Sequence, residues 1–365
     1  MMNIVPNSEH KAIGELARGL AGQDLRKNWA RWEETHEFPV ETLKKLASHG
    51  LMGVNVSKEF GGLEAGVVAY SNAVQAIAWG DPAIAVTMCV NNMVAEVLQE
   101  FGDERQKAFI PKLLSGQTPA GSFCLSEAGS GSDAAGMQAN ARRTDSGYVL
   151  NGSKAWITSG EFAGAYLVWA QVENGGKSSI SVFFVEEGTP GVSFGAPEEK
   201  MGQHASNTVV VNFDDVEVPA DALVMDVGQG FKVAMMALDG GRIGIASQAL
   251  GICDALLEEA GRIGWAASSY WSGRVEAARA LVWRAAKLKE EKAPFTYEAS
   301  VAKLYASECA SALGDTILAE AGIEAALNSN FLQKLVRDAR VTRIYEGTSE
   351  VQKIVIAREL GRRLG

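Results

Sequence analysis

Cysteine and histidine are scarce, and neither residue type is spaced as a metal site or a disulfide framework requires. The chain contains four of each, without a CxxC pair and without two histidines at metal-ligand spacing. We therefore expect neither a metal site nor a disulfide. The cysteines that we expect to be buried structural thiols are Cys89, Cys124, Cys253 and Cys309.

Long apolar runs and clusters of basic residues are also missing. No apolar run reaches the length that crosses a bilayer, and the N-terminal segment does not have the pattern of a signal peptide. Acidic residues outnumber lysine and arginine by 44 to 34, and no basic cluster is interleaved with aromatic residues, so the charge pattern of a nucleic-acid-binding protein is absent. The sequence predicts a cytoplasmic protein without membrane or nucleic-acid partners.

The chain divides into three blocks of different character, and its 365 residues exceed what one hydrophobic core usually serves. Residues 1–119 have the pattern of helices separated by loops that contain Gly and Pro. Residues 120–228 contain short runs with strand composition, separated by hairpin signals. A helical pattern returns in residues 229–365. This order predicts an α+β fold of three domains: an N-terminal helical domain, a middle antiparallel β domain and a C-terminal helical bundle.

A Gly-rich stretch, EAGSGSDAAG, covers residues 127–136. It is not a Walker loop, because no Gly-Lys-Ser/Thr follows it. It is not the turn of a dinucleotide-binding fold, because its glycines miss the G-x-G-x-x-G spacing and the residues that follow have strand composition instead of helix composition. Ser130, Ser132 and the backbone N–H groups could cradle an anion or a polar ring system. A tight polar turn is the alternative.

Trp156 and Thr158 stand near the end of a predicted strand in KAWITSG. Core packing is one interpretation of the tryptophan. The other is a flat aromatic face against a flat heterocycle, with the threonine hydroxyl near a ring heteroatom.

Glu346 lies in RDARVTRIYEGTSEVQ, residues 337–352, directly before Gly347. One interpretation is a solvated turn in which the glycine adopts the left-handed conformation that ends a helix. The alternative is a partly buried carboxylate that acts as a base.

Five segments resemble the acyl-CoA dehydrogenase family, in the order that the family has, and the nearest members are of the short-chain, butyryl type. The N-terminal text GLMGVNVSKEFGGLEAG matches more loosely, with Ser57 where a proline is usual. The five segments are FCLSEAGSGSDAAG, NGSKAWITSG, KMGQHASNTVVVNFDDVEVP, GQGFKVAMMALDGGRIGIASQALGI and RDARVTRIYEGTSEVQ.

The resemblance implies that FAD lies between the β domain and a C-terminal four-helix bundle. It implies that the residues on the flavin side are Phe123, Leu125, Ser126, Gly131, Ser132, Trp156, Thr158, Thr348 and Glu350. It implies that the residues near the acyl-CoA are Ser132, Leu238, Asp239, Arg242 and Gly347.

The same resemblance gives Glu346 the role of the base that removes the proton α to the thioester. Burial would raise the pKa of this carboxylate and strengthen it as a base. Its backbone N–H and a flavin ribityl hydroxyl would stabilise the enolate, and the β-hydride would pass to flavin N5, giving a trans-2-enoyl thioester. Some relatives place the base before the bundle arginine instead, but this chain has LDGGR, with Gly241 at that position.

Two segments depart from the family pattern. The R-x-x-F-G stretch and the Q-x-x-G-G-x-G loop, which hold the FAD of a neighbouring subunit in relatives, have no clear counterparts; the second appears as AEAGIEAALNS and keeps only Gly322. Either FAD is held by fewer contacts, or a different subunit supplies them, or the fold is kept without stable flavin.

The expected activity is an FAD-dependent dehydrogenase of short acyl-CoA thioesters that passes electrons to an electron-transfer flavoprotein. The expected assembly is a homo-oligomer, or a hetero-oligomer if another subunit completes the FAD site. The alternatives are an oxidase, a dehydrogenase of acyl groups bound to a carrier protein, and a non-catalytic partner subunit.

Overall fold

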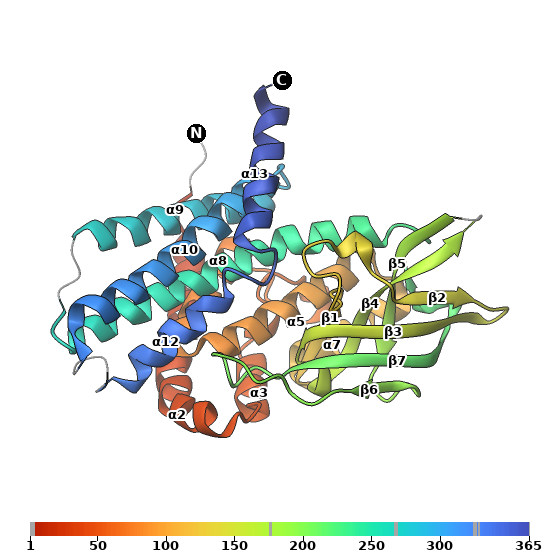
Figure 1. Ribbon diagram of the computed structural model, residues 1–365, viewed down its shortest axis with the longest axis horizontal. Coiled ribbons are helices and arrows are strands. Elements are labelled where there is room, and N and C mark those ends of the chain that lie inside the picture. Colours follow the sequence, from red (N-terminus) through yellow and green to blue (C-terminus); the bar gives the residue numbers. More distant parts are fainter. Residues whose placement is uncertain (1–3, 175–176, 266–268, 324–326, 328, 365) are drawn as a thin grey trace.

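The computed structural model describes residues 4–174, 177–265, 269–323, 327 and 329–364. Helices form the N-terminal part, strands the middle part and helices the C-terminal part (Figure 1), which confirms the predicted three-domain α+β fold. The N-terminal helices are α1 (Ser8–Leu20), a π-helical turn (Ala21–Leu25), α2 (Arg26–Thr35), α3 (Val40–Ser48), α4 (Val67–Gly80), α5 (Pro82–Phe101), α6 (Glu104–Lys107) and α7 (Ile110–Ser115).

Helix α5 has a well-defined start. Asp81 is its N-cap, and the Asp81 carboxylate accepts a hydrogen bond of 2.8 Å from the Ala83 N–H, while Pro82 occupies the first helical position. Nearly every residue from Pro82 to Leu98 is buried. A helix that is apolar all round belongs in the interior of a protein, and α5 contacts both the first strand of the β domain and the long helix that begins the C-terminal part (Figure 1).

The middle domain is an eight-stranded sheet. Seven strands have the order β6-β7-β3-β2-β4-β5-β8, and the eighth, β1, pairs with β4. The predicted antiparallel arrangement holds for most pairs, but β1 and β4 are parallel, as is the short contact of β2 with β4. The β2–β3 hairpin lies between β1 and β4 in the sequence, and the turn after β3 restores the direction that β1 and β2 have. The strands are β1 (Ala120–Cys124), β2 (Asn140–Arg143), β3 (Gly147–Thr158), β4 (Ala163–Asn174), β5 (Lys177–Glu186), β6 (Val192–Phe194), β7 (Thr208–Pro219) and β8 (Leu223–Val224).

The C-terminal domain is built on one long helix, α8, which packs against α4, α5, α9, α10 and α12. Helix α13 packs against α10, and its C-terminal end extends away from the rest of the molecule (Figure 1). The helices of this part are α8 (Gly230–Arg262), α9 (Ser269–Glu290), α10 (Thr296–Ala321), α12 (Asn330–Val341) and α13 (Ser349–Leu364).

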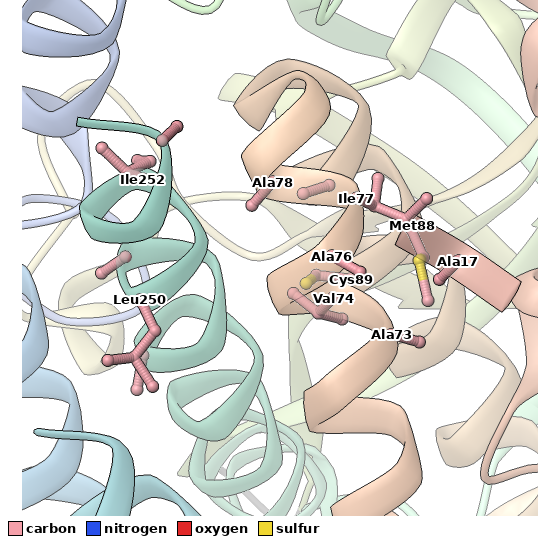
Figure 2. Close-up of a cluster of buried hydrophobic side chains, with 14 of the residues drawn as sticks. Ala17, Ala73, Val74, Ala76, Ile77, Ala78, Met88, Cys89, Leu250 and Ile252 are labelled. Carbon is pink, nitrogen blue, oxygen red and sulfur yellow. The ribbon is translucent and has the colours of Figure 1, made fainter. Parts of the chain in front are cut away.

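The largest core joins the two helical domains. Side chains from α1, α4, α5 and α8 gather in it (Figure 2). Gly251 lets α8 approach α4 closely, because a Cβ there would lie 2.7 Å from the Ala78 Cβ and 3.0 Å from the Trp79 N. The boundaries after residues 119 and 228 stay a prediction, since α5 packs on β1 and α4 on α8 across them.

All four cysteines are buried and free. Within the described residues, no helix combines the length and the hydropathy that crossing a bilayer requires.

Candidate active site

Glu346 lies in the turn between α12 and α13. Both it and Gly347 adopt left-handed backbone conformations, with φ of 54° and 86°. For a residue with a Cβ this conformation costs about 1 kcal/mol or more, so the surrounding structure must hold it. The Gln352 Nε2 donates to the carbonyl oxygens of Glu346 and Gly347, at 3.0 and 2.9 Å, and the Lys303 Nζ donates to the Gly347 oxygen at 2.6 Å.

The carboxylate of Glu346 is turned inward. Its Oε2 is buried and accepts no hydrogen bond from the described part of the protein. A Cβ at position 241 would overlap this oxygen, and it would lie 3.1 Å from the Met93 Sδ, so the absent side chain of Gly241 makes room for the carboxylate. Burial raises the pKa of Glu346 to about 7, although the cations of Arg242 and Lys303 oppose the shift.

Arg242 and Asp239 form a buried pair on α8 beside this carboxylate. The Arg242 Nη1 donates to Asp239 and, at 3.3 Å, to the Ser300 Oγ, while the Thr296 Oγ1 donates to Asp239 at 2.5 Å. The Arg242 Nε is buried without an acceptor among the described residues. Burial raises the pKa of Asp239 despite the adjacent guanidinium. The structure thus brings Asp239, Arg242 and Glu346 together, as expected for one site.

The backbone of the Glu346 turn also presents a donor. Among the residues that the structure describes, no carbonyl or side chain accepts a hydrogen bond from the Glu346 N–H. Because the carbonyls on either side of Gly347 are already held, this N–H has a defined direction and is available to an external oxygen atom.

The Gly-rich loop lies between β1 and β2, where an ion pair buried beneath it holds its ends. The Lys154 Nζ lies 2.7 Å from the Glu127 Oε1 and 3.1 Å from the Leu125 oxygen. Glu127 in turn accepts hydrogen bonds of 2.7 and 3.0 Å from the N–H groups of Gln138 and Ala139. The pKa of Glu127 is lowered, because these donors outweigh its burial, whereas burial lowers the pKa of Lys154. The loop is therefore a supported structure rather than a free turn.

Trp156 lies beside the Gly-rich loop and is exposed to solvent. The residue is 52% exposed and its φ is 58°, so Trp156 does not serve the core. A Cβ on Gly131 would lie 3.7 Å from the Trp156 Cζ3, which places the loop glycine at the edge of the indole. Gly131 and Ser132 are exposed as well, and the backbone oxygen of Thr158 accepts a hydrogen bond of 2.8 Å from the Ser122 Oγ. An open indole face beside an open glycine loop fits a flat ring system.

The strand before the Gly-rich loop and the turn that holds Glu346 share one apolar cluster. Phe123 of β1 and Tyr345, which precedes Glu346, pack against the same buried cluster of Val86, Val90 and Ile245. The Phe123 ring also lies 4.1 Å from that of Trp169. Strand β1 and the Glu346 turn therefore flank the α5–α8 contact.

The remaining predicted residues lie at the start of α13, beside Asp239 and at the base of the Gly-rich loop. The Thr348 Oγ1 accepts a hydrogen bond of 3.2 Å from the Val351 N–H at the start of α13, and Glu350 is exposed. Leu238 is half-buried next to Asp239, and Leu125 and Ser126 lie at the base of the loop. The roles that the resemblance implies for these residues stay predictions.

Three supporting residues were not among the predicted ones: Lys154, Lys303 and Gln352. One signal was present for Lys303, because Ala299, Ala306 and Ala310, at helical spacing from it, are all buried. A lysine within such a stripe must find a partner in the interior.

Three parts of the chain match the three domains of one family. Residues 7–117 match the acyl-CoA dehydrogenase N-terminal domain, residues 122–216 its middle domain and residues 270–361 its C-terminal domain. The chain belongs to the acyl-CoA dehydrogenase family.

Relatives of this family resemble the chain over nearly its whole length. The mitochondrial short-chain specific acyl-CoA dehydrogenase of Bos taurus is 38% identical, over 96% of this chain and 90% of its own. The structure of butyryl-CoA dehydrogenase from Megasphaera elsdenii is 35% identical, covers 98% of this chain and 100% of its own, and has a TM-score of 0.93. A structure from work on the electron transferring flavoprotein of Acidaminococcus fermentans is 32% identical, with coverage of 98% and 99% and a TM-score of 0.93.

These similarities support an FAD-dependent acyl-CoA dehydrogenase, and they do not favour the alternative activities. The cofactor FAD fits the residues present, since the exposed face of Trp156 and the supported glycine loop offer a flat surface and free backbone donors. The two segments that depart from the family pattern lie partly outside the described residues. Of the second, Gly322 ends α10 with a φ of 84°.

Proposed function

We propose that Glu346 removes the α-proton of a short acyl-CoA thioester in an FAD-dependent dehydrogenation that yields a trans-2-enoyl thioester. The observation that carries this proposal is the Glu346 Oε2, which is buried against Gly241 and accepts no hydrogen bond from any residue that the structure describes. A carboxylate that lacks a protein partner is free to accept a proton from a bound molecule.

The basicity of Glu346 supports this role. A pKa of about 7 leaves a useful fraction ionised at neutral pH, while making the carboxylate a stronger base than an exposed glutamate. The positive charges of Arg242 and Lys303 favour the ionised form of Glu346, so they hold its pKa below the value that burial alone would give.

The enolate oxygen that develops would be held by the chain itself. The Glu346 N–H is the proposed donor, since no acceptor within the described residues competes for it. Gly347 permits the close approach, because its backbone is left-handed and a side chain there would strike Gln352. Arg242, Asp239 and Leu238 are proposed to line the acyl-CoA side of the same site, with Ser132 across from them.

FAD, when bound, supplies the two-electron acceptor for the β-hydrogen. Trp156 and the loop backbone would hold its ring system, with Thr158 beside them. The other residues proposed for the flavin side are Phe123, Leu125, Ser126, Gly131, Ser132, Thr348 and Glu350.

A short acyl chain is favoured by the packing behind Glu346. One turn along α8 from Gly241, a Cβ on Gly244 would lie 2.8 Å from the Tyr70 hydroxyl and 3.1 Å from the Cys89 Sγ. Val86 and Val90 of α5 close on Ile245 of α8 in the same region. This tight packing of α5 against α8 supports a short acyl chain as the proposed substrate.

The proposed electron acceptor is an electron-transfer flavoprotein, and the proposed assembly is a homo-oligomer in the cytoplasm. The altered segments near α9 and Gly322 favour weaker retention of FAD than relatives with complete segments would have. A second, different subunit that completes the FAD site is the other outcome to test.

The deciding experiment reconstitutes the purified chain with FAD and adds butyryl-CoA anaerobically. We expect the flavin absorbance band to bleach in the wild type and to remain in Glu346→Gln, with a rate at least about 1000-fold lower because the base is missing. The variant should still bind FAD and butyryl-CoA. Normal bleaching by Glu346→Gln, or a chain that never takes up FAD, would refute the proposal.

A further inference from the structure

We propose that Lys303 is a positioning residue for Glu346: by holding the Gly347 carbonyl it fixes the turn that presents the carboxylate, and it places a cation opposite that carboxylate. This inference rests on the proposed function, because it assigns a role toward the proposed base. Lys303 acts through the turn and is not proposed to touch the substrate.

The contacts of Lys303 differ from those of the other buried lysines. Lys154 lies 2.7 Å from Glu127, and Lys334 lies 3.3 Å from Asp81, so each is neutralised by a carboxylate in direct contact. Lys303 is equally inaccessible to solvent, yet its amine meets no carboxylate within ion-pair distance in the described chain. A buried amine without a direct counter-ion is costly to maintain, so its placement calls for a reason other than stability.

The acceptor of Lys303 is the carbonyl of the residue that follows the base. With Gln352, Lys303 holds two successive carbonyls of a turn in which both residues are left-handed. Such a turn relaxes when its carbonyls are released, and the Glu346 carboxylate and N–H would move with it. The two donors come from α10 and α13, so the turn is fixed between two helices.

The charge of Lys303 also acts on Glu346. Burial lowers the pKa of Lys303 to about 7, while Glu346 favours its charged form; the reverse influence of Lys303 lowers the pKa of Glu346. Loss of this cation should therefore move the pKa of Glu346 upward. The other charged or titratable groups that act on the pair are Arg242 of α8, Glu308 of α10, Glu350 of α13, Tyr70 of α4 and Cys89 of α5.

The test measures proton transfer without oxidation. Acetyl-CoA has α-protons but no β-carbon, so exchange of its methyl protons in D₂O, followed by NMR with the FAD-loaded protein, reports on the base alone. The variants are Lys303→Met and Gln352→Leu. The matched control is Lys287→Met of α9, because the ion-pair partners of Lys287 within the described residues are Glu290 and Glu291. Exchange rates are measured from pD 5.5 to 9, and FAD content and butyryl-CoA affinity are measured for each protein.

We expect Lys303→Met to slow exchange by about 10- to 100-fold, the effect of losing a hydrogen bond from a charged donor, and to move the midpoint of the pD profile upward. Gln352→Leu should slow exchange without moving the midpoint, because the lost donor is neutral. Lys287→Met should match the wild type. A purely structural lysine would change stability or FAD content and leave the midpoint in place.

An unchanged midpoint together with a rate within threefold of the wild type in Lys303→Met would overturn the inference while leaving the proposed base intact. If Lys303→Met fails to fold or to load FAD, a rate within threefold of the wild type in Gln352→Leu overturns the positioning role, and a slower rate supports it. Absence of exchange in the wild type would refute the proposed base, and the role of Lys303 with it.

Discussion

At the level of single residues, the site depends on a missing side chain as much as on the carboxylate. Gly241 provides the volume that the Glu346 Oε2 occupies. Some relatives supply the base from the position that Gly241 has in this chain. Here the proposed base, Glu346, packs directly against that glycine. A side chain at residue 241 and an inward Glu346 exclude one another sterically.

The raised pKa of Glu346 predicts a cost in stability at alkaline pH. The folded-state pKa of about 7 lies above the ordinary value of 4.5, so the favourable contribution of the protonated carboxyl is complete below pH 4.5 and is lost as the pH rises through 7. Glu346→Gln cannot ionise. We expect it to raise the free energy of unfolding at pH 8 by up to about 3 kcal/mol.

The increase in the free energy of unfolding caused by Glu346→Gln should be about half as large at pH 5.5 as at pH 8. At pH 5.5 the wild-type carboxyl is mostly protonated in the folded state. Urea denaturation of the two proteins at both pH values measures the difference. Equal stability of wild type and variant at pH 8 would show that the carboxylate is not buried in solution.

At the level of secondary-structure elements, two strands hold the Gly-rich loop through one ion pair. Lys154 of β3 reaches beneath the loop to Glu127 and to the Leu125 oxygen, just beyond the end of β1. The strand therefore does two things at once: its next residues present Trp156 outward, and its buried lysine fixes the loop beside that indole. The proposed binding surface for the flavin and its support are therefore part of one strand.

Lys154→Met should lower the free energy of unfolding by about 3–5 kcal/mol, because it leaves Glu127 buried without its cation. Retention of FAD should fall with it, since the loop loses its support. Arg142→Met, an exposed change on β2 of the same sheet, should change stability by no more than about 0.5 kcal/mol.

The double variant Lys154→Met with Glu127→Leu should recover part of the stability and not the FAD affinity. Thermal unfolding and the flavin absorbance after gel filtration measure the two properties. Full FAD content in Lys154→Met would contradict the proposed support of the loop.

At the level of the whole molecule, the N-terminal domain and the bundle share one core. Helix α8 packs on α4 and α5 of the N-terminal domain and on α9, α10 and α12 of the bundle. The Glu346 turn and the α5–α8 contact lie along this junction, so the geometry of the site depends on the docking of two domains that are far apart in the sequence.

Two glycines of α8 test this docking. Gly251→Ala should destabilise the protein by at least about 2 kcal/mol, because the new Cβ would meet the Ala78 Cβ and the backbone of α4. Gly261→Ala should instead stabilise it by about 0.5–1 kcal/mol, because among the described residues only the adjacent backbone of α8 itself lies within 4 Å of the added Cβ.

Both variants add one methyl group to α8, so the change in helix propensity is similar in the two. The difference between their stabilities therefore reports on the contact of residue 251 with α4. Differential scanning calorimetry would record the change as a shift of one transition if the two domains unfold together. Similar effects of the two substitutions would contradict the close α4–α8 contact.

Local patterns were sufficient for much of the fold and for the centre of the site. Block composition predicted helices, then strands, then helices, and the four strands with the strongest composition are β3, β4, β5 and β7. Short β1 and the parallel β1–β4 pair were not predicted, because pairing direction depends on the path of the chain between strands and not on the strands themselves. The Glu346 segment was singled out from its own residues, and the buried state of its carboxylate agrees with one of the two interpretations.

The sequence by itself determined the order of the elements, the family and the position of the carboxylate, because each of these is written in contiguous residues. Only the tertiary structure decided that Lys303, Gln352 and Gly241, from three different helices, meet at residues 346 and 347. Helical periodicity reports which face of a helix is buried, but it does not say which face of another helix is its neighbour. That choice is made by the packing of the whole molecule, and with it the proposed basicity of Glu346.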